Sequence, residues 1–413
     1  MNHLKKVGLV ALLLTASCAA RAETFRTDIN PALLYYQGFL LAPQMSEADL
    51  DYLGTNFWGV QPLPAKFGEL TARYDDEFKF VRQAAHSTVP CDWGLDLSQW
   101  PRTMMPQLPR GKAVAVGSSP RMVWELTHGQ PDQAREDLLA TLALARNISR
   151  DQTVIGTLVQ IAMESITTWN VAQNFGLFPP DGLERLVAGI DALPPRGTLA
   201  AAVTNEAALS RHWAFATVDA LRRAYPGDDA EVMAKLHDLF KDMGPREDAE
   251  PDPWDKFVKA AGGSSESMLD LFRNAEPAYQ QLLLALNLPW PEFESRKQAL
   301  LSEMQNATNP LLTSFPAILK ARRRETRSLV MVAMVRAAVA YKLHGEAGLQ
   351  GVTDPAGTGP FGFRRFIFEG VDRGFQLTSV LDAGGFAESL IFVETPGPAF
   401  LVGGPHAGTA RGK

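Results

Sequence analysis

The sequence predicts a mainly α protein: an irregular array of helical hairpins with a long core helix and a small C-terminal β-meander. Three observations predict this fold class. Apolar side chains recur at helical spacing through most of the chain after residue 23. Pro, Gly and capping residues divide that pattern into separate helices. After Gly345 the pattern changes to short strands between Gly-rich and Pro-rich turns.

Length and composition bound the class of protein. A chain of 413 residues with 46% apolar and 21% charged residues is globular and too long for one ordinary core. Two Cys residues exclude a disulfide scaffold or a multi-Cys metal cluster. With 40 basic and 46 acidic residues the chain is acidic, which argues against nucleic acid as a partner because phosphate binding needs a basic face.

The N-terminus has the three parts of a secretory signal peptide. Two lysines precede an apolar run at 7–16, and Ala20 and Ala22 place small side chains at the cleavage positions. The apolar run is about half the length that a membrane span needs. We expect a signal peptide at 1–22 and a mature chain from Glu23 without a transmembrane span, in the periplasm or elsewhere in the cell envelope.

A second cleavage site competes with the first. Residues 14–18 resemble a bacterial lipobox, in which small residues precede a Cys that receives lipid. Thr15 stands where that motif usually has a branched aliphatic residue. The resemblance implies lipidation of Cys18, and a lipid anchor stays open beside soluble export, which the sequence favours.

Residues 23–243 are predicted as one helical region. Asn30 caps a helix that begins at Pro31. Another short helix opens at Ser46, and a longer one spans 64–85. Four prolines then interrupt the chain, which predicts a long internal loop at 86–110.

A helical hairpin is predicted at 121–146, with its turn at 128–132. Gly129, Ala134 and Leu138 resemble the second half of a tetratricopeptide motif. No comparable match recurs one period of about 34 residues later, and stacking repeats are what that family needs, so we expect a single hairpin.

The next helix begins at Asp151, which is predicted as its cap and opens the clearest amphipathic stripe of the chain. An acidic, Pro-rich linker is expected at 244–253. A second helical region, 254–345, ends in the long core helix, whose apolar second half carries a single Arg and fits a protein core better than a membrane. The remaining helices are expected at 181–192, 199–224, 229–242, 254–260, 265–286, 291–305 and 315–343.

The β-meander is expected within 346–402, followed by a flexible tail at 403–413. The end of the chain resembles the pseudopilin-type C-terminal module, which also closes many uncharacterised exported bacterial helical proteins. The resemblance covers 327–393 and implies a fold only, because a large helical region stands here where a pseudopilin has a short chain with an N-terminal stem. The residues that carry it are His344-Gly345, Asp354-Pro355, Gly359-Pro360-Phe361 and Phe375-Gln376-Leu377-Thr378-Ser379.

Familiar motifs point to no cofactor and no metal. The GxGxxG at 357–362 lacks the strand before it and the helix after it that a dinucleotide site needs, so we expect a turn. The His residues have no metal-ligand spacing. The basic run 320–327 is expected to be a solvated helix segment.

One loop gathers residues that could carry chemistry. His86 could lower the pKa of Cys91, and Asp92 could orient the imidazole, which would give an activated thiol nucleophile. The simpler interpretation is that Cys91 packs beneath a long loop, since free Cys is among the most buried residue types. The weak candidates for binding are Trp93, Asp96 and Trp100.

Two functions follow from these observations. The sequence favours an exported, non-catalytic binding or scaffold protein of the cell envelope, with a peptide or protein as the partner class. The alternative is an exported hydrolase or transferase that uses the loop with His86, Cys91 and Asp92.

Overall fold

The computed structural model describes residues 26–54, 62–241, 253–305, 308–382 and 385–395. This part of the chain is mainly helical with one small antiparallel sheet near its C-terminal end, so the predicted fold class is confirmed. The signal peptide at 1–22, Cys18, the linker before Pro253 and the tail at 403–413 lie outside the described residues.

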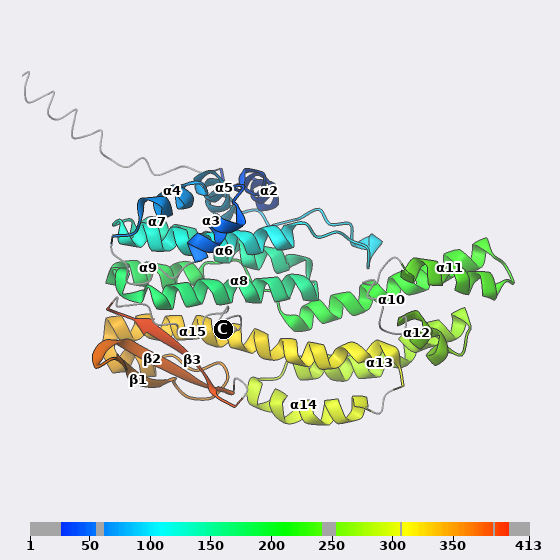
Figure 1. Cartoon of the computed structure of the whole chain (residues 1–413). Coiled ribbons are helices and arrows are strands. Elements are labelled where there is room, and N and C mark those ends of the chain that lie inside the picture. The colour runs from blue at the N-terminus through cyan, green and yellow to red at the C-terminus, as the bar shows by residue number, and fades with distance from the viewer. Residues whose placement is uncertain (1–25, 55–61, 242–252, 306–307, 383–384, 396–413) are drawn as a thin grey trace, which may run out of the picture.

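The N-terminal helices stack in layers, α5 on α7, α7 on α8 and α8 on α15 (Figure 1). Apolar stripes at helical spacing face the neighbouring layer, which is what drives amphipathic helices together. The helices of these layers are α2 (Pro31–Leu41), α3 (Glu47–Gly54), α4 (Ala65–Ala72), α5 (Asp75–Ala85), α6 (Gln107–Thr127), α7 (Pro131–Ile148), α8 (Val154–Gln173) and α9 (Pro180–Asp191).

The second half of the chain adds a projecting arm and returns along the layers (Figure 1). We call residues 213–271 the arm. Its core is separate from the rest and consists of Ala214, Val218, Val232, Leu236, Ala261, Met268, Leu269 and Leu271. The helices are α10 (Leu199–Ala224), α11 (Asp229–Lys241), α12 (Pro253–Ala261), α13 (Ser265–Leu286), α14 (Trp290–Gln305) and α15 (Phe315–Gln350).

The long helix α15 forms the centre of the largest apolar cluster. Val330, Met334 and Val335 have no exposed surface, as the prediction of a core helix requires. Gly345 has φ 66°, so the helical geometry breaks there, within two residues of the predicted end at Leu343. Among the described helices, none has the length and apolar character of a membrane span.

The sheet is the predicted meander. Strands β1 (Gly362–Phe368), β2 (Val371–Asp382) and β3 (Ala387–Val393) pair antiparallel in chain order. Phe375 lies opposite Phe392, and the ring of Phe175 packs against both at centroid distances of 5.8 and 5.2 Å. The stacked aromatic rings attach the sheet to the turn after α8. Residues 357–359 are bends in the loop before the sheet, as expected of a turn, and Gly362 is already the first residue of β1.

Three predicted boundaries were wrong. The loop expected at 86–110 ends at Pro106, because Pro109 lies in the first turn of α6, where its missing N–H has no helical partner to lose. The helix expected at 64–85 is two helices that break at Arg73 and Tyr74. The cap of α8 is Thr153, whose Oγ1 accepts from the amide of Gly156, and not Asp151.

Candidate functional site

A long connection crosses the molecule between α5 and α6. We call residues 87–106 the strap. Its first residues are attached to the N-terminal segment: the amide of Thr88 donates to the carbonyl of Thr27 at 2.8 Å, and Ser87 Oγ donates to the carbonyl of Ile29 at 2.6 Å.

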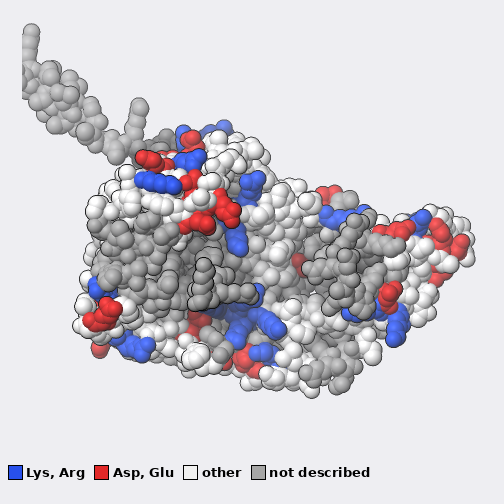
Figure 2. Space-filling view, in the orientation of Figure 1, with Lys and Arg blue, Asp and Glu red and all other residues white. Residues whose placement is uncertain are grey.

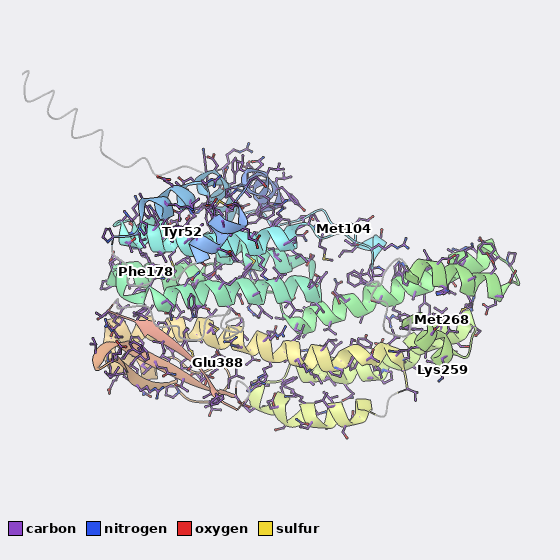
Figure 3. The ribbon with its side chains drawn as sticks, in the orientation of Figure 1. Tyr52, Met104, Phe178, Lys259, Met268 and Glu388 are labelled. Atoms are coloured by element: carbon purple, nitrogen blue, oxygen red, sulfur yellow. The ribbon has the colours of Figure 1, made fainter. Side chains whose placement is uncertain are left out.

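The middle of the strap reaches α10 and α11. Trp100 Nε1 donates to Ser210 Oγ on α10 at 3.0 Å, and Arg102 Nη2 donates to the carbonyl of Leu239 on α11 at 3.3 Å. Figure 3 labels Met104 on this segment, where 83% of the residue is exposed. The strap therefore links the N-terminal layers to α10 and the arm.

Each of the three predicted catalytic residues has different neighbours in the structure. His86 is exposed, and its Nε2 lies 3.6 Å from Glu136 Oε2 on α7, which raises the pKa of the imidazole. Cys91 is 8% exposed, and burial raises the pKa of its thiol to about 12. Asp92 Oδ1 accepts from the amide of Gly94 at 2.9 Å. Cys91 is therefore a neutral thiol at pH 7, which is the opposite of an activated nucleophile.

Of the three predicted binding residues, Trp93 and Trp100 attach the strap to the helices, while Asp96 bonds within the strap. Trp93 is 7% exposed and stacks on Tyr35 at 5.6 Å between ring centroids, while its Nε1 donates to the carbonyl of Asn147 at 2.8 Å. Asp96 is exposed, and its Oδ1 accepts from the amide of Ser98 at 3.0 Å. Trp100 is half-buried against α10, as described above.

The strap returns to α6 beside a corner that carries two carboxylates. At the N-terminus of α8, Glu206 Oε1 accepts from the amide of Val154 at 2.7 Å, and Asp151 Oδ1 lies 3.4 Å from the amide of Thr153. Asn205, the neighbour of Glu206 on α10, donates to the carbonyl of Asp151 at 3.2 Å. Residues 55 positions apart in sequence thus meet at one helix end.

Both carboxylates are poorly solvated. Burial raises the pKa of Asp151, and burial together with the negative charge of Asp151 raises the pKa of Glu206. Asp151 Oδ2 is buried and accepts no hydrogen bond. Gln152, the residue after Asp151, has φ 53° and ψ 44°, a left-handed conformation that non-Gly residues seldom adopt.

A separate buried amide lies at the first residue of α6. Gln107 is 0% exposed, and neither its Oε1 nor its Nε2 has a hydrogen-bond partner. Such a group costs free energy in a dry interior, and in a native protein it calls for a specific explanation. Asp151 and Glu206 at the N-terminus of α8 make up what we call the corner site.

Two other buried carboxylates, those of Glu164 and Asp137, are paired with arginines. Glu164 on α8 accepts from Arg196 Nε at 3.0 Å and from Ser328 Oγ on α15 at 2.6 Å. In the N-terminal layers, Arg121 donates to Asp137 Oδ2 at 2.9 Å. These pairs join helices of different layers, and we assign them to stability.

Surface charges of both signs lie on the face that Figure 2 shows. Figure 2 shows Lys and Arg interspersed with Asp and Glu on the visible face. In the basic run of α15, Arg327 Nε lies 2.7 Å from Glu388 Oε2, and Arg323 Nη2 lies 3.9 Å from Asp382 Oδ1. Among the described residues, no group of three or more His, Cys, Asp or Glu side chains could hold a metal ion.

Sequence reasoning missed the corner site. Asp151 was expected only as a helix cap, and Glu206 belongs to no motif. What brings Asp151 and Glu206 together is tertiary packing of α8 against α10, which local spacing does not reveal. No protein-family model, curated protein or solved structure matches this chain, so the chemistry of the corner site rests on its own residues.

Proposed function

We propose that this chain is an exported protein of the bacterial cell envelope that acts by binding, as a non-catalytic binding or scaffold protein. The observation that carries the proposal is the state of Cys91. Cys91, the nucleophile that the sequence predicts, is buried among apolar side chains, and its pKa is raised to about 12. A thiol in that state does not attack a substrate at neutral pH.

The architecture supports the proposal. Helical arrays commonly present large faces to peptides or proteins, although a fold alone does not decide function. Here the strap contacts α10 through Trp100 and Ser210, and Asp151 and Glu206 lie at the N-terminus of α8. The resemblance of 327–393 to the pseudopilin-type module enters this proposal only as a link to exported proteins.

The alternative, a hydrolase or transferase, needs an exposed Cys91 with an imidazole within hydrogen-bond reach. The imidazole of His86 instead faces Glu136, and the charges that act on the Cys91 thiol belong to Arg150, Asp92 and Asp151. We therefore favour the binding protein.

Thiol labelling tests the choice. In the chain from Glu23, Cys91 is the only thiol, and iodoacetamide at pH 8 should leave it unmodified in the native protein and alkylate it fully in 6 M guanidinium. A matched control is Val89→Cys with Cys91→Ser, since Val89 is 37% exposed on the same strap, and it should react in the native state. Native alkylation of Cys91 at the rate of the control would favour the enzyme.

Export is tested on the full-length chain. We expect a bacterial host to place it in the envelope fraction with an intact mass that begins at Glu23. A mass that begins at a lipidated Cys18 would show the anchored form. An unprocessed chain in the cytoplasmic fraction would contradict export.

A further inference from the structure

We propose that Glu125 on α6 and Asp137 on α7 share one proton in the folded protein, and that loss of this proton at alkaline pH weakens the contact between the two helices. The helices pack against each other in the N-terminal layers. Both residues are buried, since Glu125 is 4% exposed and Asp137 is 0% exposed. The shared proton goes beyond the proposed binding role and does not depend on it.

The first step is the geometry of Arg121, which contacts both carboxyl groups. Its Nε donates to Asp137 Oδ2 at 2.9 Å, and its Nη2 donates to Glu125 Oε1 at 3.0 Å. These two N–H groups point in parallel from one edge of the guanidinium, and such a pair usually binds both oxygens of a single carboxylate. Here they bind two different carboxyl groups, which therefore lie side by side. Asp137 is a hydrogen-bond partner of Glu125, and since an ionised carboxylate only accepts hydrogen bonds, one of the two must carry a proton.

The second step is the distribution of positive charge, which assigns the proton to Glu125. Asp137 has two cationic partners, because Arg82 on α5 donates to its Oδ1 at 2.6 Å and Arg121 donates to its Oδ2. The salt bridge of Glu125 is with Arg121, which also pairs with Asp75. A carboxyl group with fewer opposite charges nearby takes up a proton more readily. Glu125 is therefore the acid of the pair, and Asp137 is the ionised member.

The third step is the environment of Glu125 Oε2. This oxygen is buried and accepts no hydrogen bond from the described residues. An ionised carboxyl group in that position would lose its hydration without replacement, whereas a neutral one avoids most of that cost. Burial and the negative charge of Asp137 accordingly raise the pKa of Glu125 to about 9, while Arg121 and Arg82 act in the opposite direction.

Polar and charged groups from four helices surround the pair. Those not yet named are Thr71 on α4, Glu77 on α5, Arg110 on α6 and Gln133 on α7. Thr71 and Gln133 contribute neutral hydrogen bonds, to Arg121 and from the Gln133 amide to Asp137. Glu77 is a further acid that draws on the positive charge of Arg121, as it does on that of Arg110, which favours the proton on Glu125.

Helices α8 and α9 also pack on α6 or α7, but their charges are paired elsewhere. Glu164, the one charged residue of α8, pairs with Arg196, and Arg185 on α9 pairs with Asp181. Within the described part of the chain, Glu125 therefore has no cation that it does not share with another acid.

Urea unfolding of the purified protein from about pH 7.5 to 9 tests the shared proton. The sign follows from the raised pKa of Glu125: its stabilisation is complete below the ordinary value of 4.5 and is lost as pH rises through about 9. Over the tested range the folded protein holds one proton that the unfolded chain has released. This group alone should therefore lower the ratio of folded to unfolded molecules about tenfold for each pH unit.

Glu125→Gln is the test variant, because its amide has the hydrogen-bonding groups of the protonated acid. The carbonyl accepts from Arg121, and the N–H donates to Asp137. We expect the pH dependence of this variant to be weaker than that of the wild type by about tenfold in the ratio per pH unit. Asp132→Asn is the matched control: it removes a carboxylate that is 66% exposed on α7, and its pH dependence should match the wild type.

Infrared difference spectroscopy tests the proton without unfolding the protein. It uses Glu77→Gln as the background, because Glu77 is a second buried acid with a raised pKa. At pH about 7.5 we expect the C=O stretching band of a protonated carboxylic acid, because Glu125 then carries the proton. The band should disappear at pH about 10, and also when Glu125→Gln is added.

Either measurement can overturn the proposal. Parallel pH dependence of the wild type and Glu125→Gln would show that Glu125 keeps no proton on folding. An infrared spectrum without the protonated band, or with a band that Glu125→Gln leaves in place, would show the same. If Glu125→Gln fails to fold, the band of the Glu77→Gln protein and its loss at alkaline pH still test the shared proton. Cys91 labelling is a separate readout, so the outcome here and that for the binding role are told apart.

Discussion

Glu77 lies on α5 with 3% of its surface exposed. Burial raises its pKa to about 7, and the positive charges of Arg121 and Arg110 offset only part of that rise. The folded protein therefore holds a proton at this site more tightly than the unfolded chain does. Glu125 on α6 shows the same direction, because burial and the nearby Asp137 raise its pKa as well.

The pH dependence of stability should follow from Glu77. An acid with a raised pKa in the folded state contributes stability below its unfolded pKa of 4.5, and this is lost as pH rises to about 7. We expect Glu77→Gln to remove a loss on the order of 3 kcal/mol between pH 4.5 and 8. Urea unfolding at both pH values measures it. Glu69→Gln, at an exposed position on α4, should behave as wild type, and equal slopes in all three proteins would contradict this account.

The buried amide of Gln107 allows a second prediction about a single residue. Replacing a buried amide without partners by an apolar side chain of similar shape removes a desolvation cost. We expect Gln107→Met to raise the free energy of unfolding by about 1 kcal/mol or more. Chemical denaturation of the variant and the wild type measures this difference in the free energy of unfolding. A fall in stability would mean that the amide is satisfied in solution, by water or by an unseen partner.

Among the elements, β2 is held at a position that only Gly fits. Gly374 has φ 145°, and a Cβ there would overlap the carbonyl oxygen of Phe392 on the neighbouring strand β3. The close approach brings Phe375 and Phe392 into stacked contact at 5.3 Å between centroids. Through Phe175 these rings attach the sheet to the helical layers.

Gly374→Ala should therefore destabilise the protein by about 2–4 kcal/mol, from backbone strain and overlap with a neighbouring main chain. Thermal or urea unfolding measures the loss. Gly359→Ala is the control: an added Cβ at Gly359 meets nothing within 4 Å, and the change should stay within about 0.5 kcal/mol. Equal effects of the two substitutions would show that the strand pairing differs from the one described.

The elements also show what sequence can predict. Helices α10 and α13 begin and end at the predicted residues, because Thr198 and Ser264 supply caps and breakers follow. Pro109 misled the prediction, since a proline stops a helix in its interior but is accepted in the first turn. The corner site was out of reach, because no local pattern connects Asp151 with Glu206.

In the whole molecule, buried ion pairs connect layers that are distant in sequence. Glu164 on α8 lies against Arg196 before α10, Ser328 on α15 and, at 3.9 Å, Arg146 on α7. The side-chain exposure of Glu164 is 1%. Removing one partner of a buried pair costs much more than the pair contributes, because the other charge stays buried.

Glu164→Ala should lower the free energy of unfolding by about 3–5 kcal/mol, since Arg196 and Arg146 lose their carboxylate. Asp270→Ala serves as control: it removes a pair with Arg273 in which both side chains are about half exposed, and it should cost about 0.5 kcal/mol or less. Urea unfolding of both variants measures the two losses in the free energy of unfolding. A loss for Glu164→Ala as small as that of the control would mean that the layers are held by apolar packing alone.

Because α10 continues without a break into the arm, its length determines the direction in which the arm points. The helix is rooted beside α15 at Leu199 and enters the arm core at Ala214, and Ser210 lies between them. A single alanine inserted after Ala208 would turn everything beyond it by about 100°, carry Ser210 away from Trp100 and swing the arm out of phase with the strap. Four inserted residues would leave a phase error of only about 40°. The direction in which the arm points about the axis of α10 thus depends on the number of residues in the helix. Each inserted residue changes that direction by about 100°.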